Sequence, residues 1–304
     1  MTARRDIDLI GIPLEAGAGR RGCIMGPDGY RTAGLAETLA ELGHNVADRG
    51  NVTPGDAGAV SVKGKARNAA QIAAWTRAID AAGAAAGDRT PIFMGGDHSL
   101  SIGSINSMAR RAKAAGRPLF ALWLDAHSDF NTPATSPSGN IHGMPVAALT
   151  GAKGLDFLFE GIERAVLPHD AFHMFGIRSV DAQERRNLRA HGIQVADMRQ
   201  IDEHGTARLM AGIIARAANA NAMIHVSLDV DFLDPEIAPA VGTTVPGGAT
   251  FREAHLVMEM LADSGLVTSL DLVELNMFMD HAGKSARLMV DLVASLFGRS
   301  IIDR

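Results

Sequence analysis

The sequence predicts an α/β fold in which helices cover both faces of a mainly parallel sheet. Short aliphatic and β-branched runs alternate along the chain with longer Ala- and Leu-rich segments, and this alternation is typical of β-α-β units. Several of the short runs are apolar almost throughout, as expected for strands that helices bury on both faces. No linker interrupts the pattern, so we expect residues 1–304 to form a single domain.

The expected strands are the short apolar runs. In chain order they cover residues 7–12, 92–94, 119–124, 172–177, 194–196, 224–229 and 267–273. The longer segments between them predict helices over residues 28–42, 66–86, 99–115, 181–190, 203–219, 250–263 and 284–297. Segments 131–143 and 232–248 follow strand ends and are rich in Pro, Gly, Ser and Thr. Loops of this length inside a compact domain are usually functional or mobile.

Composition and charge exclude several classes of protein. The net charge is −5, which argues against a nucleic-acid partner, since such proteins usually carry a basic face. No run approaches the roughly 18 continuous apolar residues that a membrane helix needs. The single cysteine, Cys23, cannot form an intrachain disulfide, so a reducing compartment is the default. The N-terminal segment lacks the pattern of a signal peptide. We therefore expect a cytoplasmic protein.

Three segments combine acidic and imidazole side chains. They are GGDHS at residues 95–99, DAHSD at 125–129 and SLDVD at 227–231. Each begins where a predicted strand ends, and ligands bind at the carboxyl ends of strands in open parallel sheets. Within each segment, residues two apart point to the same side of an extended chain. The acidic and imidazole groups are therefore expected to converge on one side of the sheet.

The convergent side chains favour a metal site. Buried carboxylates need a counter-charge, and the three segments contain no lysine or arginine. Six ligands are too many for one zinc site and suit two metals, which can hold a bridging hydroxide. Oxygen and imidazole ligands without thiolate favour Mn²⁺, with Co²⁺ or another divalent ion as an alternative. The six candidates are His98, Asp125, His127, Asp129, Asp229 and Asp231.

Each segment also has an ordinary structural explanation. A lone DxD is usually a cap, a turn or a solvated face, and Asp97 or Ser99 could cap a helix. The coincidence of three such segments at three strand ends favours the metal site.

These motifs resemble those of the ureohydrolase family, which contains arginases, agmatinases and their relatives. GGDHS, DAHSD and SLDVDFLDP resemble the family's metal-binding signatures, and the likeness extends from residue 10 to about residue 276. The resemblance implies a three-layer α/β/α domain around a mainly parallel, eight-stranded sheet. It also implies a metal-dependent hydrolase acting on a guanidino substrate, and assemblies of three or six copies.

The resemblance assigns catalytic roles to three residues. Asp129 would hold a proton during attack on the substrate and pass it to the leaving amine. His142 would exchange that proton with solvent, which suits an imidazole near neutral pH. Glu274, at the end of a predicted strand, would pair with the planar guanidinium group.

The loop after DAHSD indicates which substrate is bound. SGNIHGMP at residues 138–145 resembles the arginase branch, in which the counterparts of Asn131, Ser136 and Ser138 bind the α-carboxylate of L-arginine. Asp181 would recognise the α-ammonium group. The resemblance further assigns Glu184 and Thr243 to substrate binding. The expected reaction is therefore the hydrolysis of L-arginine to L-ornithine and urea.

Two departures and three alternatives remain open. Phe232 stands where the family often has a small residue and could reshape the pocket wall, and Met277 stands where a proline is common. The alternatives are a ureohydrolase acting on agmatine or another guanidino compound, a metal-dependent deacetylase, and a metal-storing or assembly protein without turnover. The histidines outside these motifs lack a partnered cluster and are expected to be mostly surface or structural. They are His44, His169, His173, His191, His204, His225, His255 and His281.

Overall fold

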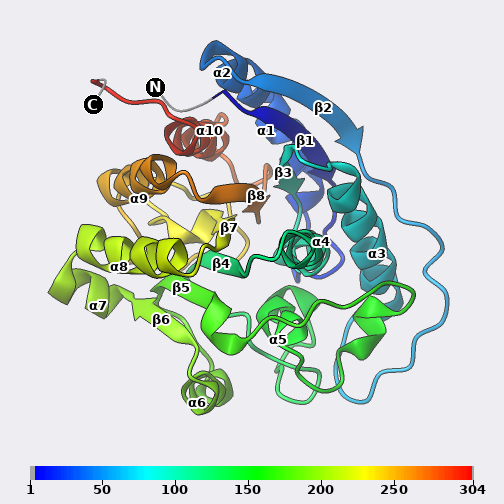
Figure 1. The fold of residues 1–304 in the computed structure, drawn as a ribbon. Helices are drawn as coiled ribbons and strands as arrows, with labels where there is room; N and C mark the ends of the chain where they lie inside the picture. The colour runs from blue at the N-terminus through cyan, green and yellow to red at the C-terminus, as the bar shows by residue number, and fades with distance from the viewer. Residues whose placement is uncertain (1–3, 303–304) are drawn as a thin grey trace.

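The computed structural model describes residues 4–302, which contain one parallel sheet (Figure 1). The strand order across the sheet is β2-β1-β3-β8-β7-β4-β5-β6, and every neighbouring pair is parallel. The strands are β1 (Asp6–Ile12), β2 (Asn45–Asn51), β3 (Thr90–Gly95), β4 (Leu119–Leu124), β5 (Phe172–Ile177), β6 (Gln194–Asp197), β7 (Met223–Asp229) and β8 (Val267–Val273).

Helices cover both faces of the sheet. They are α1 (Gly26–Thr32), α2 (Leu35–Glu41), α3 (Ala69–Ala85), α4 (Ser101–Ala114), α5 (Pro145–Leu149), α6 (Ala182–His191), α7 (Met198–His204), α8 (Thr206–Asn219), α9 (Phe251–Ser264) and α10 (Lys284–Leu296). Figure 1 shows α8, α9 and α10 on one face and α3, α4 and α5 on the other. The α/β/α prediction is confirmed.

Side-chain alternation along the strands divides the core into two layers. Ile7 and Leu9 of β1 pack with the helices on the α8–α10 face, whereas Ile10 and Ile12 pack on the α3–α5 face. Successive strand residues point to opposite faces, so strands that are apolar throughout fill both layers.

The structure corrects three sequence-based boundaries. Strand β2 was not predicted, and the predicted helix 28–42 is two helices separated by Gly34, which has a left-handed φ of 83°. The predicted helix 203–219 is likewise interrupted at Gly205, with φ 82°. Glycine adopts these dihedral angles without steric cost, so each residue marks a break between helices.

The strand order brings the three metal-ligand motifs together. β3, β8, β7 and β4 are neighbours in the middle of the sheet, and the motifs 95–99, 227–231 and 125–129 begin in or follow β3, β7 and β4. No helix among residues 4–302 is long and apolar enough to cross a membrane.

Candidate metal centre and substrate cavity

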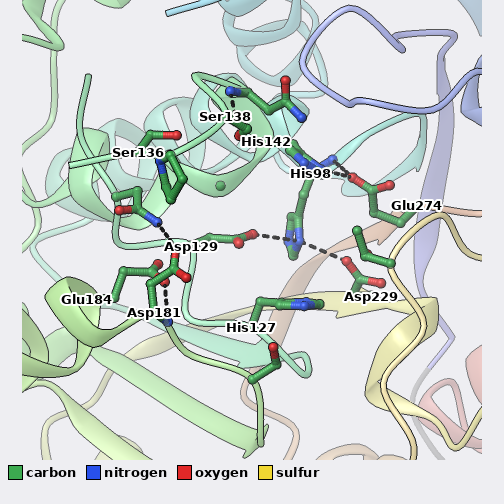
Figure 2. Close-up of a pocket in the computed structure, with 16 residues that line it drawn as sticks. His98, His127, Asp129, Ser136, Ser138, His142, Asp181, Glu184, Asp229 and Glu274 are labelled. Atoms are coloured by element: carbon green, nitrogen blue, oxygen red, sulfur yellow. Dashed lines mark hydrogen bonds and ion pairs between the residues drawn. The ribbon is translucent and has the colours of Figure 1, made fainter. Parts of the chain in front are cut away.

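The site lies where the four central strands end. His98 begins a short 3₁₀ turn after β3, Asp125 follows β4, Asp229 ends β7, and Glu274 follows β8. His98, Asp229 and Glu274 line a cavity of about 320 Å³, and Figure 2 labels all three of them. The predicted residues therefore lie side by side although they come from distant parts of the chain.

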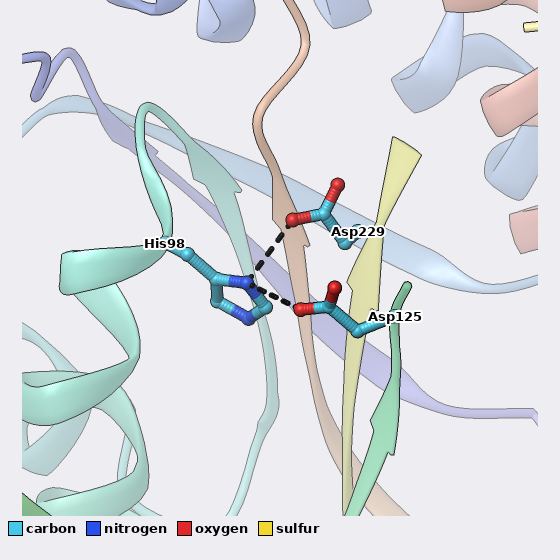
Figure 3. A group of neighbouring side chains, drawn as sticks. All are labelled: His98, Asp125 and Asp229. Carbon is cyan, nitrogen blue, oxygen red and sulfur yellow. Dashed lines mark ion pairs between the residues drawn. The ribbon is translucent and has the colours of Figure 1, made fainter. Parts of the chain in front are cut away.

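One group of potential metal ligands centres on the imidazole of His98 (Figure 3). Its Nδ1 lies 3.0 Å from Oδ2 of Asp125 and 3.1 Å from Oδ2 of Asp229. Asp129 approaches the same nitrogen at 3.3 Å through its Oδ2. Four side chains from three loops thus direct nitrogen or oxygen atoms at one point.

A second group shares Asp125 with the first. The Nδ1 atom of His127 lies 3.1 Å from Oδ2 of Asp231 and 3.5 Å from Oδ1 of Asp125. The two oxygens of Asp125 face different groups, so this carboxylate belongs to both of them.

The charges of the cluster call for cations. Burial raises the pKa of Asp129 and Asp229, and nearby carboxylates add to that effect. Burial opposes protonation of His98, but contacts with Asp125 and Asp229 outweigh it and raise the pKa of His98. Among residues 4–302, no lysine or arginine forms an ion pair with the cluster's four carboxylates.

The donor set fits metal ions. The buried atoms Nδ1 of His98 and Oδ2 of Asp125 have no hydrogen-bond partner among the described residues. Buried polar atoms normally have such partners, and a metal ion would satisfy both. The ligands are imidazole nitrogens and carboxylate oxygens, a combination suited to Mn²⁺ and related divalent ions.

Two residues of the site have strained backbones. Asp129 has φ 46° and Glu274 has φ 65°, in the left-handed region that residues other than glycine seldom adopt. Strain of this kind persists where the surrounding structure holds a functional group in place.

Glu274 is held by three groups. Its Oε1 accepts a hydrogen bond from the backbone N–H of His98 and lies 2.9 Å from Nδ1 of His142. Among residues 4–302, its Oε2 accepts a hydrogen bond only from the thiol of Cys23, at 3.5 Å. Burial raises the pKa of Cys23, so that group stays a neutral donor, and Oε2 is the oxygen with room for a further partner.

The contact between Glu274 and His142 shifts both pKa values. Burial disfavours the imidazolium form of His142, but the negative charge of Glu274 and their hydrogen bond outweigh it and raise the pKa of His142 to about 9. Burial also disfavours the ionised form of Glu274, and His142 reverses that effect, so the pKa of Glu274 is lowered.

The cavity brings the predicted substrate-binding residues together with metal-ligand candidates. Ser136, Ser138, Asp181 and Glu184 line the same cavity as His98 and Asp229, and Figure 2 labels all six. Asp125 and Asp231 are buried outside the lining. All six predicted residues line the cavity, namely Asn131, Ser136, Ser138, Asp181, Glu184 and Thr243.

Several of these residues also hold the loops in place. Asn131 donates to Asp181 at 3.3 Å, and Thr243 donates to Oδ2 of Asp231 at 3.0 Å. Glu184 accepts from the Ser128 hydroxyl and from the backbone N–H groups of Phe130 and Asp181. Both oxygens of Glu184 are thus engaged by the protein itself.

The structure adds residues that the sequence did not single out. Asn140 and Ser179 line the cavity, and the buried Oδ1 of Asn140 has no hydrogen-bond partner among residues 4–302. Asn140 lies within SGNIHG, so its place in that loop was the available signal. Asp97 accepts hydrogen bonds from the backbone N–H groups of Gly17 and Ala18. These bonds hold the loop that contains Gly17 and Ala18 beside the site.

Phe232 does not belong to the cavity wall. Its side chain is fully buried and packs 6.3 Å from the ring of Phe175, measured between centroids. The expectation that it reshapes the pocket wall is therefore wrong, because this ring fills the core beneath the site.

Known proteins match this chain over nearly its whole length. A protein named arginase from Brucella melitensis is 54% identical over 298 residues, covering 97% of each chain. A native arginase structure from Bacillus caldovelox is 39% identical, with a TM-score of 0.89, covering 98% of this chain and 100% of that one. An arginase structure from Entamoeba histolytica in complex with L-ornithine is 26% identical, with a TM-score of 0.86, covering 97% and 99%. Residues 5–298 match the Arginase family, and the protein therefore belongs to it.

Proposed function

We propose that the protein hydrolyses L-arginine to L-ornithine and urea. The observation that carries this proposal is the single cavity that joins two potential metal-ligand groups to a wall of hydroxyl, amide and carboxylate side chains. Relatives at 54% and 51% identity bear the name arginase. The Entamoeba histolytica relative was solved with L-ornithine, which is one product of the proposed reaction.

The metal-ligand groups would hold two divalent ions, and we propose Mn²⁺. When bound, the ions would lower the pKa of a shared water and supply hydroxide at neutral pH. Asp125 belongs to both groups and would contact both ions. Asp129, the most exposed of the four carboxylates at 9%, would hold the proton released on attack and return it to the leaving amine.

Glu274 and His142 would act on the guanidinium end of the substrate. The pKa of Glu274 is lowered, so its carboxylate is charged at neutral pH and can pair with the planar cation. Oε2 is available for that pairing because Oε1 already contacts His98 and His142. His142 would exchange protons with solvent, as imidazoles do in general acid–base catalysis.

The cavity wall would recognise the amino-acid end of the substrate. Asn131 and Ser138 carry neutral hydrogen-bonding groups suited to the α-carboxylate, and Asp181 carries a charge suited to the α-ammonium group. Agmatine lacks the carboxylate. Groups built to bind a substrate's polar atom reject analogues without it, since their own polar atoms then stay unpaired.

Substrate choice tests this proposal. Wild-type protein loaded with Mn²⁺ should release urea from L-arginine far faster than from agmatine. The double variant Asn131→Ala/Ser138→Ala should lose arginine hydrolysis and retain the slow agmatine reaction, because the groups that act on the guanidinium are unchanged. Urea release from both substrates measures this. Equal rates on both substrates in the wild type would show a ureohydrolase of another specificity.

Two coarser properties complete the proposal. An assembly of three or six copies stays a prediction, which the mass of the native protein in solution would decide. A cytoplasmic location also stays a prediction, supported by the single cysteine, which is buried.

A further inference from the structure

A buried polar chain lies behind the metal-ligand groups, on the face of the sheet covered by α4. Its members are His98, Ser101, Ser104, His225, Ser227, Ser269 and Asp271, and each is at most 1% exposed. In β7 and β8, register pairs His225 with Ser269 and Ser227 with Asp271. Polar side chains therefore occupy alternate positions of two central strands, at 225 and 227 in β7 and at 269 and 271 in β8.

Asp271 contacts three other members of this chain. Its Oδ2 accepts hydrogen bonds from the hydroxyls of Ser101 and Ser104, each at 2.7 Å, and lies 3.0 Å from Nε2 of His225. Its Oδ1 has no hydrogen-bond partner among residues 4–302, and no lysine or arginine of that part of the chain pairs with it. A buried carboxylate in such a setting is costly, which calls for a functional reason.

The metal-ligand candidate His98 lies at one end of the chain. Its Nε2 is 2.8 Å from Oγ of Ser227, and that hydroxyl is 3.2 Å from Oγ of Ser101. Trp123 stacks on the His98 imidazole with the ring centroids 4.0 Å apart. The indole fixes the plane of the imidazole, and the hydroxyls contact the nitrogen that faces away from the carboxylates.

The acceptor character of Asp271 sets the direction of the hydrogen bonds that lead through Ser101 and Ser227 to His98. A carboxylate only accepts, so Ser101 must donate its one proton to Asp271. Ser101 can then only accept from Ser227. Because Ser227 donates its own proton to Ser101, its hydroxyl oxygen accepts the hydrogen bond from Nε2–H of His98.

We propose that Asp271 positions the metal ligand His98 through two serine hydroxyls: it keeps the imidazole proton on Nε2 and leaves Nδ1 free to bind a metal ion. The proposal rests on the metal-binding role proposed above for His98. Metal-binding histidines commonly donate their second ring N–H to a partner that fixes their orientation. Here the partner is the Ser227 hydroxyl, and Asp271 fixes through Ser101 that this hydroxyl accepts the hydrogen bond from His98.

Ser101 and Ser104 provide a matched pair for the test. Both hydroxyls lie on α4, are fully buried and donate to the same oxygen at the same distance. Only Ser101 continues to Ser227. Ser101→Ala should therefore weaken Mn²⁺ affinity about 10–100-fold, whereas Ser104→Ala should stay close to wild type. Titration of metal-free protein with Mn²⁺, with free ion followed by electron paramagnetic resonance, measures both without substrate.

Ser227→Ala breaks the chain at its link to His98 and should reproduce the loss seen with Ser101→Ala. Thermal unfolding of the metal-free variants shows whether each one folds. Equal Mn²⁺ affinity in Ser101→Ala and Ser104→Ala would overturn the proposal. Failure of Ser101→Ala and Ser227→Ala to fold, where Ser104→Ala folds, would assign the hydroxyls a structural role and overturn it too. Wild-type protein that binds Mn²⁺ but releases no urea would instead count against the proposed function.

Discussion

The contact between His142 and Glu274 links proton exchange to substrate binding. In the protein alone, Glu274 raises the pKa of His142 to about 9, against the effect of burial. A guanidinium group paired with Glu274 would offset that negative charge and lower the pKa of His142, because a nearby cation disfavours the imidazolium form. His142 would then release its proton more readily with substrate bound than without.

Replacing His142 by alanine should slow turnover by about 10²–10⁴-fold, the usual contribution of a general acid–base group. Metal content should stay unchanged, since His142 contacts Glu274 and belongs to neither metal-ligand group. Steady-state urea release and metal analysis of the same preparation measure the two effects. Loss of metal from the variant would instead make His142 a ligand or a structural residue.

Residues of the site that lie in short motifs could be predicted from the sequence, whereas residues that lie alone within strands could not. His127 and Asp231 belong to short motifs after strand ends, so their convergence followed from the geometry of parallel sheets. His225 and Asp271 lie within strands, each apart from any motif. The expectation that His225 lacks a partnered cluster is wrong, because β8 places Asp271 beside it. Strand order decides this pairing, and sequence periodicity does not report strand order.

His173 should make stability depend on pH. Burial lowers the pKa of His173 to about 4, and the neighbouring Arg216 adds to that effect. In the unfolded chain a histidine binds a proton near pH 6.5, so above pH 6.5 the burial of neutral His173 leaves the free energy of unfolding undiminished. As the pH falls toward 4, the unfolded chain binds a proton that folded His173 does not, and the free energy of unfolding decreases by up to about 3 kcal/mol.

The variant His173→Gln should flatten this dependence. Urea unfolding of metal-free protein at several pH values between 7.5 and 4.5 gives the free energies of unfolding. The exposed His281 offers a matched control, and His281→Gln should follow the wild-type curve. An unchanged curve in His173→Gln would contradict the assignment.

At the scale of elements, the one strand that the sequence did not predict has a physical explanation. Strand β2 lies at the edge of the sheet and reads NVADRGN, with most side chains exposed. Because β2 is not buried on both faces, it lacks the apolar run by which most of the other strands were predicted. Helices α3, α4 and α9 begin and end within a few residues of their predicted bounds.

Two glycines within helices should respond oppositely to alanine. A Cβ on Gly103 of α4 would lie 2.7 Å from the backbone oxygen of Thr76 and 2.8 Å from Cβ of Ile79. Gly103→Ala should therefore force α3 and α4 apart and cost about 1–3 kcal/mol. A Cβ on Gly212 of α8 meets no atom within 4 Å. Gly212→Ala should stabilise the protein by up to about 1 kcal/mol.

Urea unfolding of the two glycine variants beside wild type measures both changes. The same substitution is made in both helices, so helix propensity contributes equally and the difference reports packing between α3 and α4. Stabilisation by Gly103→Ala would show that this helix pair has more room than the structure indicates.

At the scale of the whole molecule, the fold places several carboxylates close together in a buried region that contains no lysine or arginine paired with them among residues 4–302. Four carboxylates and two imidazoles meet at the ends of central strands. Burial raises the pKa of Asp229 and Asp231, and the negative charges of the neighbouring carboxylates raise it further. Such an arrangement is stable only with added positive charge, from protons or from metal ions. Metal binding should therefore contribute to the stability of the entire domain.

We expect two Mn²⁺ ions per chain and a large stabilisation on binding them. A ligand at 100 times its Kd contributes about 2.7 kcal/mol per site, and for a chain of this size two sites should raise the midpoint of thermal unfolding by on the order of 10 °C. The control is Asp125→Asn, because Asp125 belongs to both metal-ligand groups and its loss should weaken both sites. Metal analysis of reconstituted protein, and thermal unfolding with Mn²⁺ and with chelator, measure these effects. A reproducible single equivalent of metal at full activity would contradict the two-metal centre. If Mn²⁺ stabilised Asp125→Asn as much as wild type, the ions would have to bind elsewhere.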